Sequence, residues 1–158
     1  MLSKEGLDIA KPRKLHLIDQ WLFVESQSYA NTWYGSSKAG NQEYMDNIYA
    51  GVANRFANEI DAGVVTVHRK PSSIACSDFP NDYFDWVYID GDHFYEGVKK
   101  DLEEYFPKVK KGGYISGDDY VIGGLWSEGV KRAVDEFINT GKVKILKAKR
   151  GQYVLQKT

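Results

Sequence analysis

The sequence predicts an α/β protein: a three-layer α/β/α sandwich with a mostly parallel sheet and an antiparallel strand at the C-terminus. Short apolar runs rich in β-branched residues alternate with segments whose apolar residues recur every three or four positions. This alternation is typical of parallel strands joined by helices. Near the C-terminus, two strand-like runs flank Arg150 and Gly151 without a helix between them, which predicts an antiparallel pair.

The first predicted elements are a short helix, a strand and a long loop. Residues 2–10 predict a short helical fragment, and the apolar run 15–18 predicts a buried strand that ends at Asp19. Residues 21–40 are aromatic and polar without a regular period, so they predict a long loop, which could cover a pocket.

The clearest helix signal follows Asn41, a residue type that caps helix N-termini. Apolar residues then recur at three- and four-residue spacing over residues 44–60, which predicts one long amphipathic helix. Gly63 opens the β-branched run 64–68, which predicts the second strand.

The second half continues the alternation. Pro71 starts a short helix, and residues 86–89 predict a strand that ends at Asp90. Further elements are an amphipathic helix stopped by Pro107, a strand at 114–116 after two glycines, a helix capped by Ser127, and the terminal strands 143–148 and 152–156.

Size and composition limit the classes of function. A chain of 158 residues has the length of one ordinary domain, so we expect a single domain over residues 1–158. A formal net charge of −1 provides no basic field for a polyanion, which argues against nucleic acid as a partner. The single cysteine, Cys76, excludes an internal disulfide and a cysteine zinc cluster. Without a signal-peptide core or a run of ~20 apolar residues, we expect a soluble, cytoplasmic protein without a membrane partner.

Carboxylates follow three of the predicted strands. Ligands of open α/β sheets bind at the carboxyl ends of the strands, and Asp19, Asp90, Asp92, Asp118 and Asp119 lie at such ends. If strands 86–89 and 114–116 are neighbours, ~4.8 Å apart, then Asp90, Asp118 and Asp119 could converge. Mg²⁺ prefers oxygen ligands of this kind, so these three residues are a candidate magnesium site.

Each of these residues also has a structural interpretation. Asp92 and Asp119 could cap turns or helices, and Asp90 could simply be solvated. Asp19 could accept hydrogen bonds from the ribose hydroxyls of a nucleotide, or it could cap its own loop. His93, with an ordinary pKa of ~6.5, could act as a general base or lie in an exposed turn. Spacing alone leaves these alternatives open.

The remaining reactive side chains favour structural roles. His16 and His68 have no acidic or cysteine neighbour at ligand spacing, and Cys76 has no local histidine. The chain contains neither a Gly-x-Ser-x-Gly elbow nor a P-loop, which excludes serine hydrolases and P-loop NTPases.

Three motifs resemble those of class I S-adenosylmethionine-dependent methyltransferases. They are FDWVYIDGDHFYEGVKKDL at 84–102, KGGYISGDDY at 111–120 and GVKRAVDEF at 129–137. The resemblance is to the small-molecule O-methyltransferase branch that includes macrocin and related sugar O-methyltransferases, and it covers the chain from about residue 15 onward. It implies a Rossmann-like fold, S-adenosylmethionine as cofactor and a small-molecule or sugar acceptor. Apart from the resemblance, a homo-oligomer is a further expectation.

The resemblance also implies roles for individual residues. Asp19 would bind the cofactor ribose, and Pro71, Ser72 and Ser73 would lie near the adenine, with Asp90 as a further cofactor contact. In the divalent-cation-dependent catechol-type O-methyltransferases, carboxylates at the positions of the candidate magnesium ligands Asp90, Asp118 and Asp119 hold Mg²⁺.

His93 is implied as the catalytic residue, although that group has a lysine there. The implied reaction is methyl transfer: Mg²⁺ lowers the pKa of a substrate hydroxyl, His93 or solvent takes the proton, and the oxygen attacks the sulfonium methyl in line.

One departure from the family pattern stands out. In the family a first strand and a Gly-x-Gly loop precede the segment that matches residues 2–10, so we expect an N-terminally truncated or atypical form. Unpaired backbone groups in the middle of a sheet cost ~1–3 kcal/mol each, so a longer chain, a strand from another chain or a closed-up sheet would have to compensate. A non-catalytic binding or assembly module without cofactor affinity, and a hydroxylase or hydrolase with the same acidic metal site, are the alternatives.

Overall fold

The structure is a computed structural model that describes residues 11–26, 29, 40–123 and 128–158. It divides into two compact units, Met1–Ser72 and Ser73–Thr158, each described by itself. The predicted helix at 2–10, part of the predicted loop at 21–40 and the predicted cap Ser127 lie outside the described residues. The single-domain organisation stays a prediction. Within the described residues, every helix is too short or too polar to traverse a lipid bilayer.

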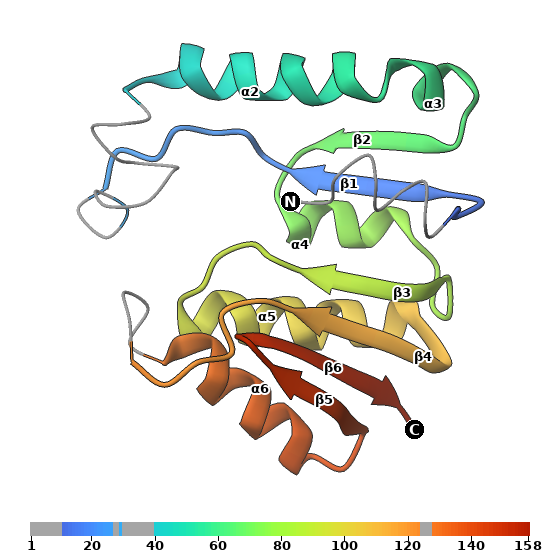
Figure 1. Ribbon diagram of the computed structural model, residues 1–158, viewed down its shortest axis with the longest axis vertical. Helices are drawn as coiled ribbons and strands as arrows, with labels where there is room; N and C mark the ends of the chain where they lie inside the picture. Colours follow the sequence, from blue (N-terminus) through green and yellow to red (C-terminus); the bar gives the residue numbers. More distant parts are fainter. Residues whose placement is uncertain (1–10, 27–28, 30–39, 124–127) are drawn as a thin grey trace. The chain divides into compact units, whose positions relative to one another are not determined.

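The first unit contains a two-stranded parallel sheet and two connecting helices (Figure 1). Strand β1 (Leu15–Asp19) pairs in register with β2 (Val65–Arg69). Between them lie α2 (Gln42–Arg55) and α3 (Ala57–Asp61). Alternate residues of each strand pack against the helices, which agrees with the strands predicted from the apolar runs.

The long predicted helix is interrupted at Phe56. Asn41 caps α2 as expected, because its side chain accepts a hydrogen bond from the Tyr44 N–H at 3.1 Å. Phe56 then leaves helical geometry, with φ −106° and ψ 17°, and its buried ring packs in the core of the unit beside Val65. The apolar spacing continues across the break, so the sequence pattern did not reveal it.

The second unit contains a four-stranded mixed sheet with the order β3-β4-β6-β5 (Figure 1). Strands β3 (Phe84–Ile89) and β4 (Val109–Gly117) are parallel. Strand β6 (Gln152–Lys157) is antiparallel to both β4 and β5 (Val143–Lys149), which confirms the predicted antiparallel pair. Of the four strand pairs among the described residues, two are parallel and two antiparallel, so the sheets are mixed rather than mostly parallel.

Helices α5 (Tyr95–Tyr105) and α6 (Gly129–Asn139) pack on one face of this sheet. Their apolar stripes share one core with inward-facing strand residues, and the fully buried members include Leu102, Ile115, Val134 and Leu155. The short helix α4 (Ser72–Ala75) starts directly after Pro71, as the Pro71 signal predicted. Both long helices of the unit therefore cover the same face of its sheet, and the three-layer arrangement of the whole chain stays a prediction.

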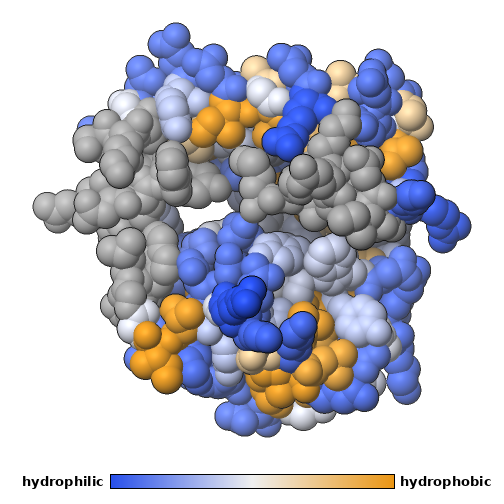
Figure 2. Space-filling view, in the orientation of Figure 1, coloured by the Kyte–Doolittle hydropathy of each residue, from blue (hydrophilic) through white to orange (hydrophobic). Residues whose placement is uncertain are grey.

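The other face of the sheet and its outer strand are partly exposed. Trp86 and Tyr88 of β3 project there, and the Trp86 indole N–H donates to the Ser116 hydroxyl at 2.6 Å. Figure 2 shows apolar patches among the hydrophilic side chains, and Ile145 and Leu146 of β5 are exposed. Lysines flank these two apolar residues along β5, and charged side chains on an outer strand discourage pairing with other chains.

Candidate functional site

The candidate site lies where β3 and β4 end side by side. Ile89, the last residue of β3, is paired with Gly117, the last residue of β4. The loop 90–93 therefore emerges beside Asp118 and Asp119, which meets the condition under which these residues were expected to converge. Parallel strands deliver their carboxyl ends to the same edge of a sheet, and this arrangement gathers the acidic residues there.

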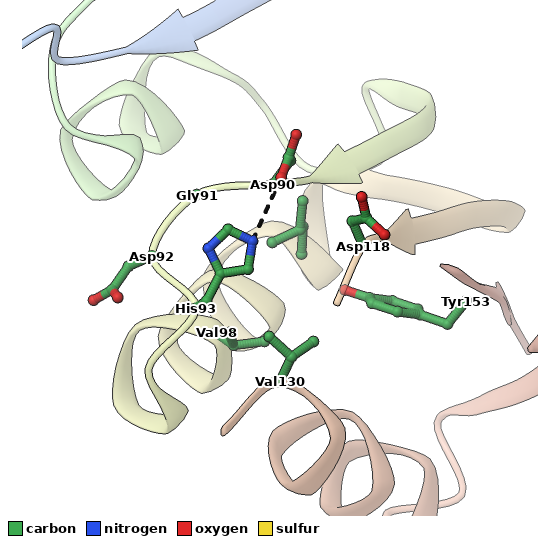
Figure 3. Close-up of a pocket in the computed structure, with 9 residues that line it drawn as sticks. Asp90, Gly91, Asp92, His93, Val98, Asp118, Val130 and Tyr153 are labelled. Carbon is green, nitrogen blue, oxygen red and sulfur yellow. Dashed lines mark ion pairs between the residues drawn. The ribbon is translucent and has the colours of Figure 1, made fainter. Parts of the chain in front are cut away.

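The His93 ring contacts carboxylates from both strand ends, and Figure 3 shows its contact with Asp90. Its Nε2 atom is 3.2 Å from Oδ2 of Asp119 and 3.5 Å from Oδ1 of Asp90. The His93 side chain is only 19% exposed, whereas the two carboxylates remain partly open to solvent. The structure thus brings together three of the predicted site residues.

The contact between His93 and Asp90 changes the pKa values of both side chains. The hydrogen bond with Asp90 raises the pKa of His93 above 6.5; burial opposes this shift, and the charges of Asp119, Asp90 and Asp92 add to it. Conversely, the hydrogen bond with His93 holds the pKa of Asp90 below 3.8 against the effect of burial. The charged pair of imidazolium and carboxylate is therefore favoured in the folded protein.

We expect this pair to stabilise the fold in a limited pH window. The His93 contribution is complete below its unfolded pKa of 6.5 and is lost as the pH rises through its raised folded pKa. The Asp90 contribution is present above 3.8 and is lost as the pH falls through its lowered folded pKa. Urea unfolding at pH 5.5 and pH 8 should show that wild type loses more stability than His93→Gln on going to pH 8.

The comparison must use the difference between wild type and variant. The pKa of His16 is lowered by burial and then by the charges of His68 and Lys14, so this residue destabilises the fold as the pH falls. The His93→Gln variant retains the His16 contribution, so this contribution cancels in the difference between wild type and variant. Equal pH dependence in the two proteins would contradict the His93–Asp90 pairing.

The expected magnesium ligands are not gathered around one point. Asp118 is directed away from the His93 ring in Figure 3, and its Oδ1 accepts the Asp119 N–H at 2.9 Å. Among the described residues, no three histidine, cysteine or acidic side chains are placed to hold a metal ion. The His93 ring already lies between Asp90 and Asp119. As arranged, these residues do not fit a three-carboxylate magnesium site, and that ligand set stays a prediction.

Asp92 has the capping role that its structural interpretation proposed. Its carboxylate accepts the Phe94 N–H at 3.0 Å, just before α5 begins. A Cβ atom at Gly97 would lie 2.6 Å from Oδ2 of Asp92, so the glycine makes room for this carboxylate. Asp92 therefore fixes the path of the chain from the His93 loop into α5.

A small pocket lies beneath the loop (Figure 3). Asp90, His93 and Asp118 line it together with Val98, Val130 and Tyr153, and its volume is about 10 Å³. Tyr153 is the functional candidate that the sequence reasoning missed. In the sequence it is one aromatic residue of a terminal strand, and only pairing of β6 with β4 brings it to this pocket.

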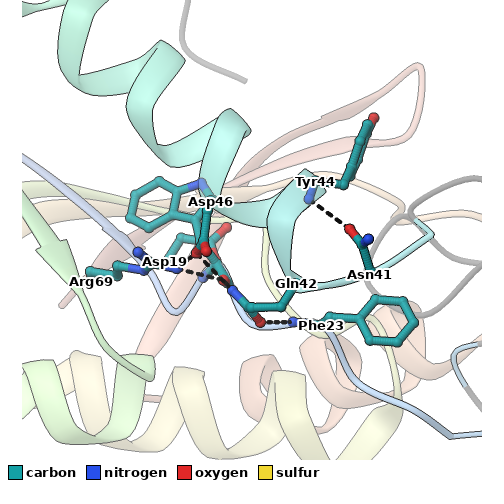
Figure 4. Close-up of polar contacts among 8 residues, drawn as sticks. Asp19, Phe23, Asn41, Gln42, Tyr44, Asp46 and Arg69 are labelled. Carbon is teal, nitrogen blue, oxygen red and sulfur yellow. Dashed lines mark hydrogen bonds and ion pairs between the residues drawn. The ribbon is translucent and has the colours of Figure 1, made fainter.

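In the first unit, Asp19 ends β1 and caps its own loop (Figure 4). Its Oδ1 accepts the Trp21 N–H at 2.7 Å, and Trp21 has a positive φ of 42°.

Gln42 and Arg69 add contacts to the same loop. Gln42 accepts the Phe23 N–H at 2.9 Å and donates to the Trp21 carbonyl, also at 2.9 Å. Arg69 forms an ion pair with Asp46 of α2 and donates to the same Trp21 carbonyl. This network supports the loop-capping interpretation, and a ribose contact of Asp19 stays a prediction.

Two further predictions concern residues around β2. Pro71, Ser72 and Ser73 follow β2 and lead into α4, and their adenine contact stays a prediction. His16 and His68 form a pair across β1 and β2, with Nδ1 of His16 3.0 Å from Nε2 of His68. The pair fits the structural role predicted for both residues.

Comparison with known proteins identifies the family. A family model described as a methyltransferase domain matches residues 3–120, about three quarters of the chain. The chain belongs to this family of S-adenosylmethionine-dependent methyltransferase domains. An uncharacterized protein of Acanthamoeba polyphaga mimivirus is 44% identical over 54 residues, which cover 34% of this chain and 24% of that protein. The chain thus spans only about a quarter of this curated relative.

Solved structures agree on the fold. A protein described as a caffeoyl-CoA O-methyltransferase from Staphylococcus aureus has a TM-score of 0.61 at 13% identity, over 98% of this chain and 80% of that one. The methyltransferase PaMTH1 of Podospora anserina, bound to S-adenosylhomocysteine, has a TM-score of 0.60 at 12% identity, over 98% and 75%. At such identities the likeness shows the α/β methyltransferase fold, as the sequence predicted.

Proposed function

We propose that the methyltransferase domain transfers a methyl group from S-adenosylmethionine to a hydroxyl oxygen of a small molecule or sugar. The observation that carries the proposal is the position of His93, held between Asp90 and Asp119 where β3 and β4 end. The carboxyl end of the strands is where open α/β sheets bind their ligands, and a histidine held there by carboxylates can accept a proton.

His93 is proposed as the general base. Contact with Asp90 and Asp119 raises its pKa, which makes the neutral ring a stronger base for a hydroxyl proton. The bound cofactor would supply an electrophilic methyl group on sulfonium sulfur. His93 would take the acceptor's hydroxyl proton as the new O–C bond forms and the C–S bond breaks, and would later release that proton to solvent.

The cofactor contacts of the proposal are Asp19, Pro71, Ser72, Ser73 and Asp90. One carboxylate oxygen of Asp19 accepts the Trp21 N–H, and the carboxylate retains further acceptor positions for ribose hydroxyls. Mg²⁺ held by Asp90, Asp118 and Asp119 stays a prediction, because these side chains are not gathered around one point among the described residues.

Cofactor binding tests the proposal most directly. We expect S-adenosylhomocysteine to raise the thermal unfolding midpoint of the wild-type chain, because a ligand that binds only the folded state stabilises it. Asp19→Asn keeps an oxygen for the Trp21 N–H but removes the charge, so its affinity in calorimetry should be about ten- to a hundredfold lower.

Asp61→Asn, a change at the exposed end of α3, is the matched control and should bind like wild type. Absence of any effect of S-adenosylmethionine or S-adenosylhomocysteine on wild type would overturn the proposal and favour a binding or assembly module.

A further inference from the structure

Tyr153 places a polar atom in the core of the second unit. The residue is 1% exposed, and its ring packs with the apolar residues of α5, α6 and the sheet. Its Oη atom is buried and has no hydrogen-bond partner among the described residues. A buried hydroxyl without a partner is costly, so such a group points to a water molecule or ligand beside it.

The position of this hydroxyl is narrowly constrained. A Cβ atom on Gly117 would lie 2.6 Å from Tyr153 Oη and 2.4 Å from the Ile89 carbonyl oxygen. The hydroxyl therefore lies against Gly117, where β4 has no side chain, next to the last residue of β3. The loop with Asp90 and His93 begins at this point.

The pocket beside the hydroxyl has the size of one water molecule. Its volume of about 10 Å³ is close to the ~10–15 Å³ that one water requires. Tyr153 lines it together with Asp90, His93 and Asp118, and Figure 3 shows the Tyr153 hydroxyl directed into the space enclosed by these side chains. The lining thus offers polar groups besides the Tyr153 hydroxyl, which a buried water needs as partners.

We propose that Tyr153 is a positioning residue whose hydroxyl holds one buried water under the Asp90–His93 loop and thereby orients His93. The role of His93 rests on the proposed function, whereas the water site does not. Burial, then the charges of Asp101, Tyr88 and Asp90, raises the pKa of Tyr153, so the hydroxyl keeps its proton and donates to the water. Tyr153 lies beyond residues 3–120, the part that matches the family.

Tyr153→Phe tests the inference because it removes only the hydroxyl. A high-resolution crystal structure of wild type should show a water within hydrogen-bond distance of Oη, and this water should be absent from the variant. Amide hydrogen exchange should become faster at residues 90–93 and stay unchanged in β4 and β6. In an assay with an identified methyl acceptor, kcat of Tyr153→Phe should fall on the order of tenfold with KM unchanged. This loss is smaller than the roughly hundredfold loss caused by a 1 Å misplacement of a reacting group.

Tyr105→Phe is the matched control, since Tyr105 is also buried but lies at the opposite end of α5 from the His93 loop. It should leave exchange at residues 90–93 and kcat unchanged. A wild-type structure without the water, or a Tyr153→Phe variant with wild-type exchange in the loop, would overturn the inference. The crystal structure and the amide exchange rates do not depend on methyl transfer. Failure of the proposed function would therefore be recognised separately from failure of this inference.

Discussion

Replacing His93 with alanine is expected to lower kcat for methyl transfer by about 10²- to 10⁴-fold, the usual contribution of a general base. The ring is held by Asp90 and Asp119 at 3.5 and 3.2 Å, and its removal leaves the acceptor hydroxyl without a positioned base. Affinity for S-adenosylhomocysteine should change little. Steady-state kinetics and calorimetry on the same preparations measure the two effects.

The pH dependence and a second histidine variant make this prediction specific. In wild type, kcat/KM should rise with pH through the raised pKa of His93, because the neutral ring is the base. That rise should vanish in His93→Ala, and added imidazole should restore part of the rate. His16→Gln, in the β1–β2 pair, should keep the wild-type kcat. A His93→Ala enzyme as fast as wild type would exclude the proposed base.

Gly117→Ala is expected to cause the largest loss of stability among the single changes considered. A Cβ atom there would lie 2.4 Å from the Ile89 carbonyl oxygen and 2.6 Å from Tyr153 Oη. The neighbouring backbone cannot move without disturbing the β3–β4 pairing. We expect the free energy of unfolding to fall by about 3 kcal/mol, the upper part of the range for overpacked cores.

Gly51→Ala provides a control for the same chemical change. Gly51 lies within α2, is exposed, and has open space around the position of a Cβ atom. Alanine there should stabilise the helix by roughly 0.5–1 kcal/mol. Urea unfolding monitored by circular dichroism compares both variants with wild type. If Gly117→Ala proves as stable as wild type, the close approach of Tyr153 and Ile89 to Gly117 is wrong.

The strands and their acidic ends were predictable from local patterns. Each apolar run marks a strand, and a carboxylate directly after a run must lie at its carboxyl end. The pairing of β3 with β4 meets the condition under which loop 90–93 and Asp119 were expected to converge. Local patterns also offered a turn-capping role for Asp92, because an aspartate side chain often accepts the backbone N–H two residues further on.

Other features depend on contacts between segments far apart in the chain. Asp119 reaches His93 because it adopts a left-handed φ of 56° after β4. Aspartate can adopt this conformation, but the Asp–Asp dipeptide does not by itself predict it. Sequence spacing suggested three carboxylates around a metal, whereas side-chain directions instead place an imidazole between two of them.

The sequence by itself therefore determined the order of strands and helices and the edge of the sheet at which acidic groups collect, because both follow from backbone periodicity. Only the tertiary structure decided that His93 lies between Asp90 and Asp119 and that Tyr153 approaches the same pocket. The physical reason is that strand register and turn geometry set where side chains meet, and neither is encoded in the spacing of one segment.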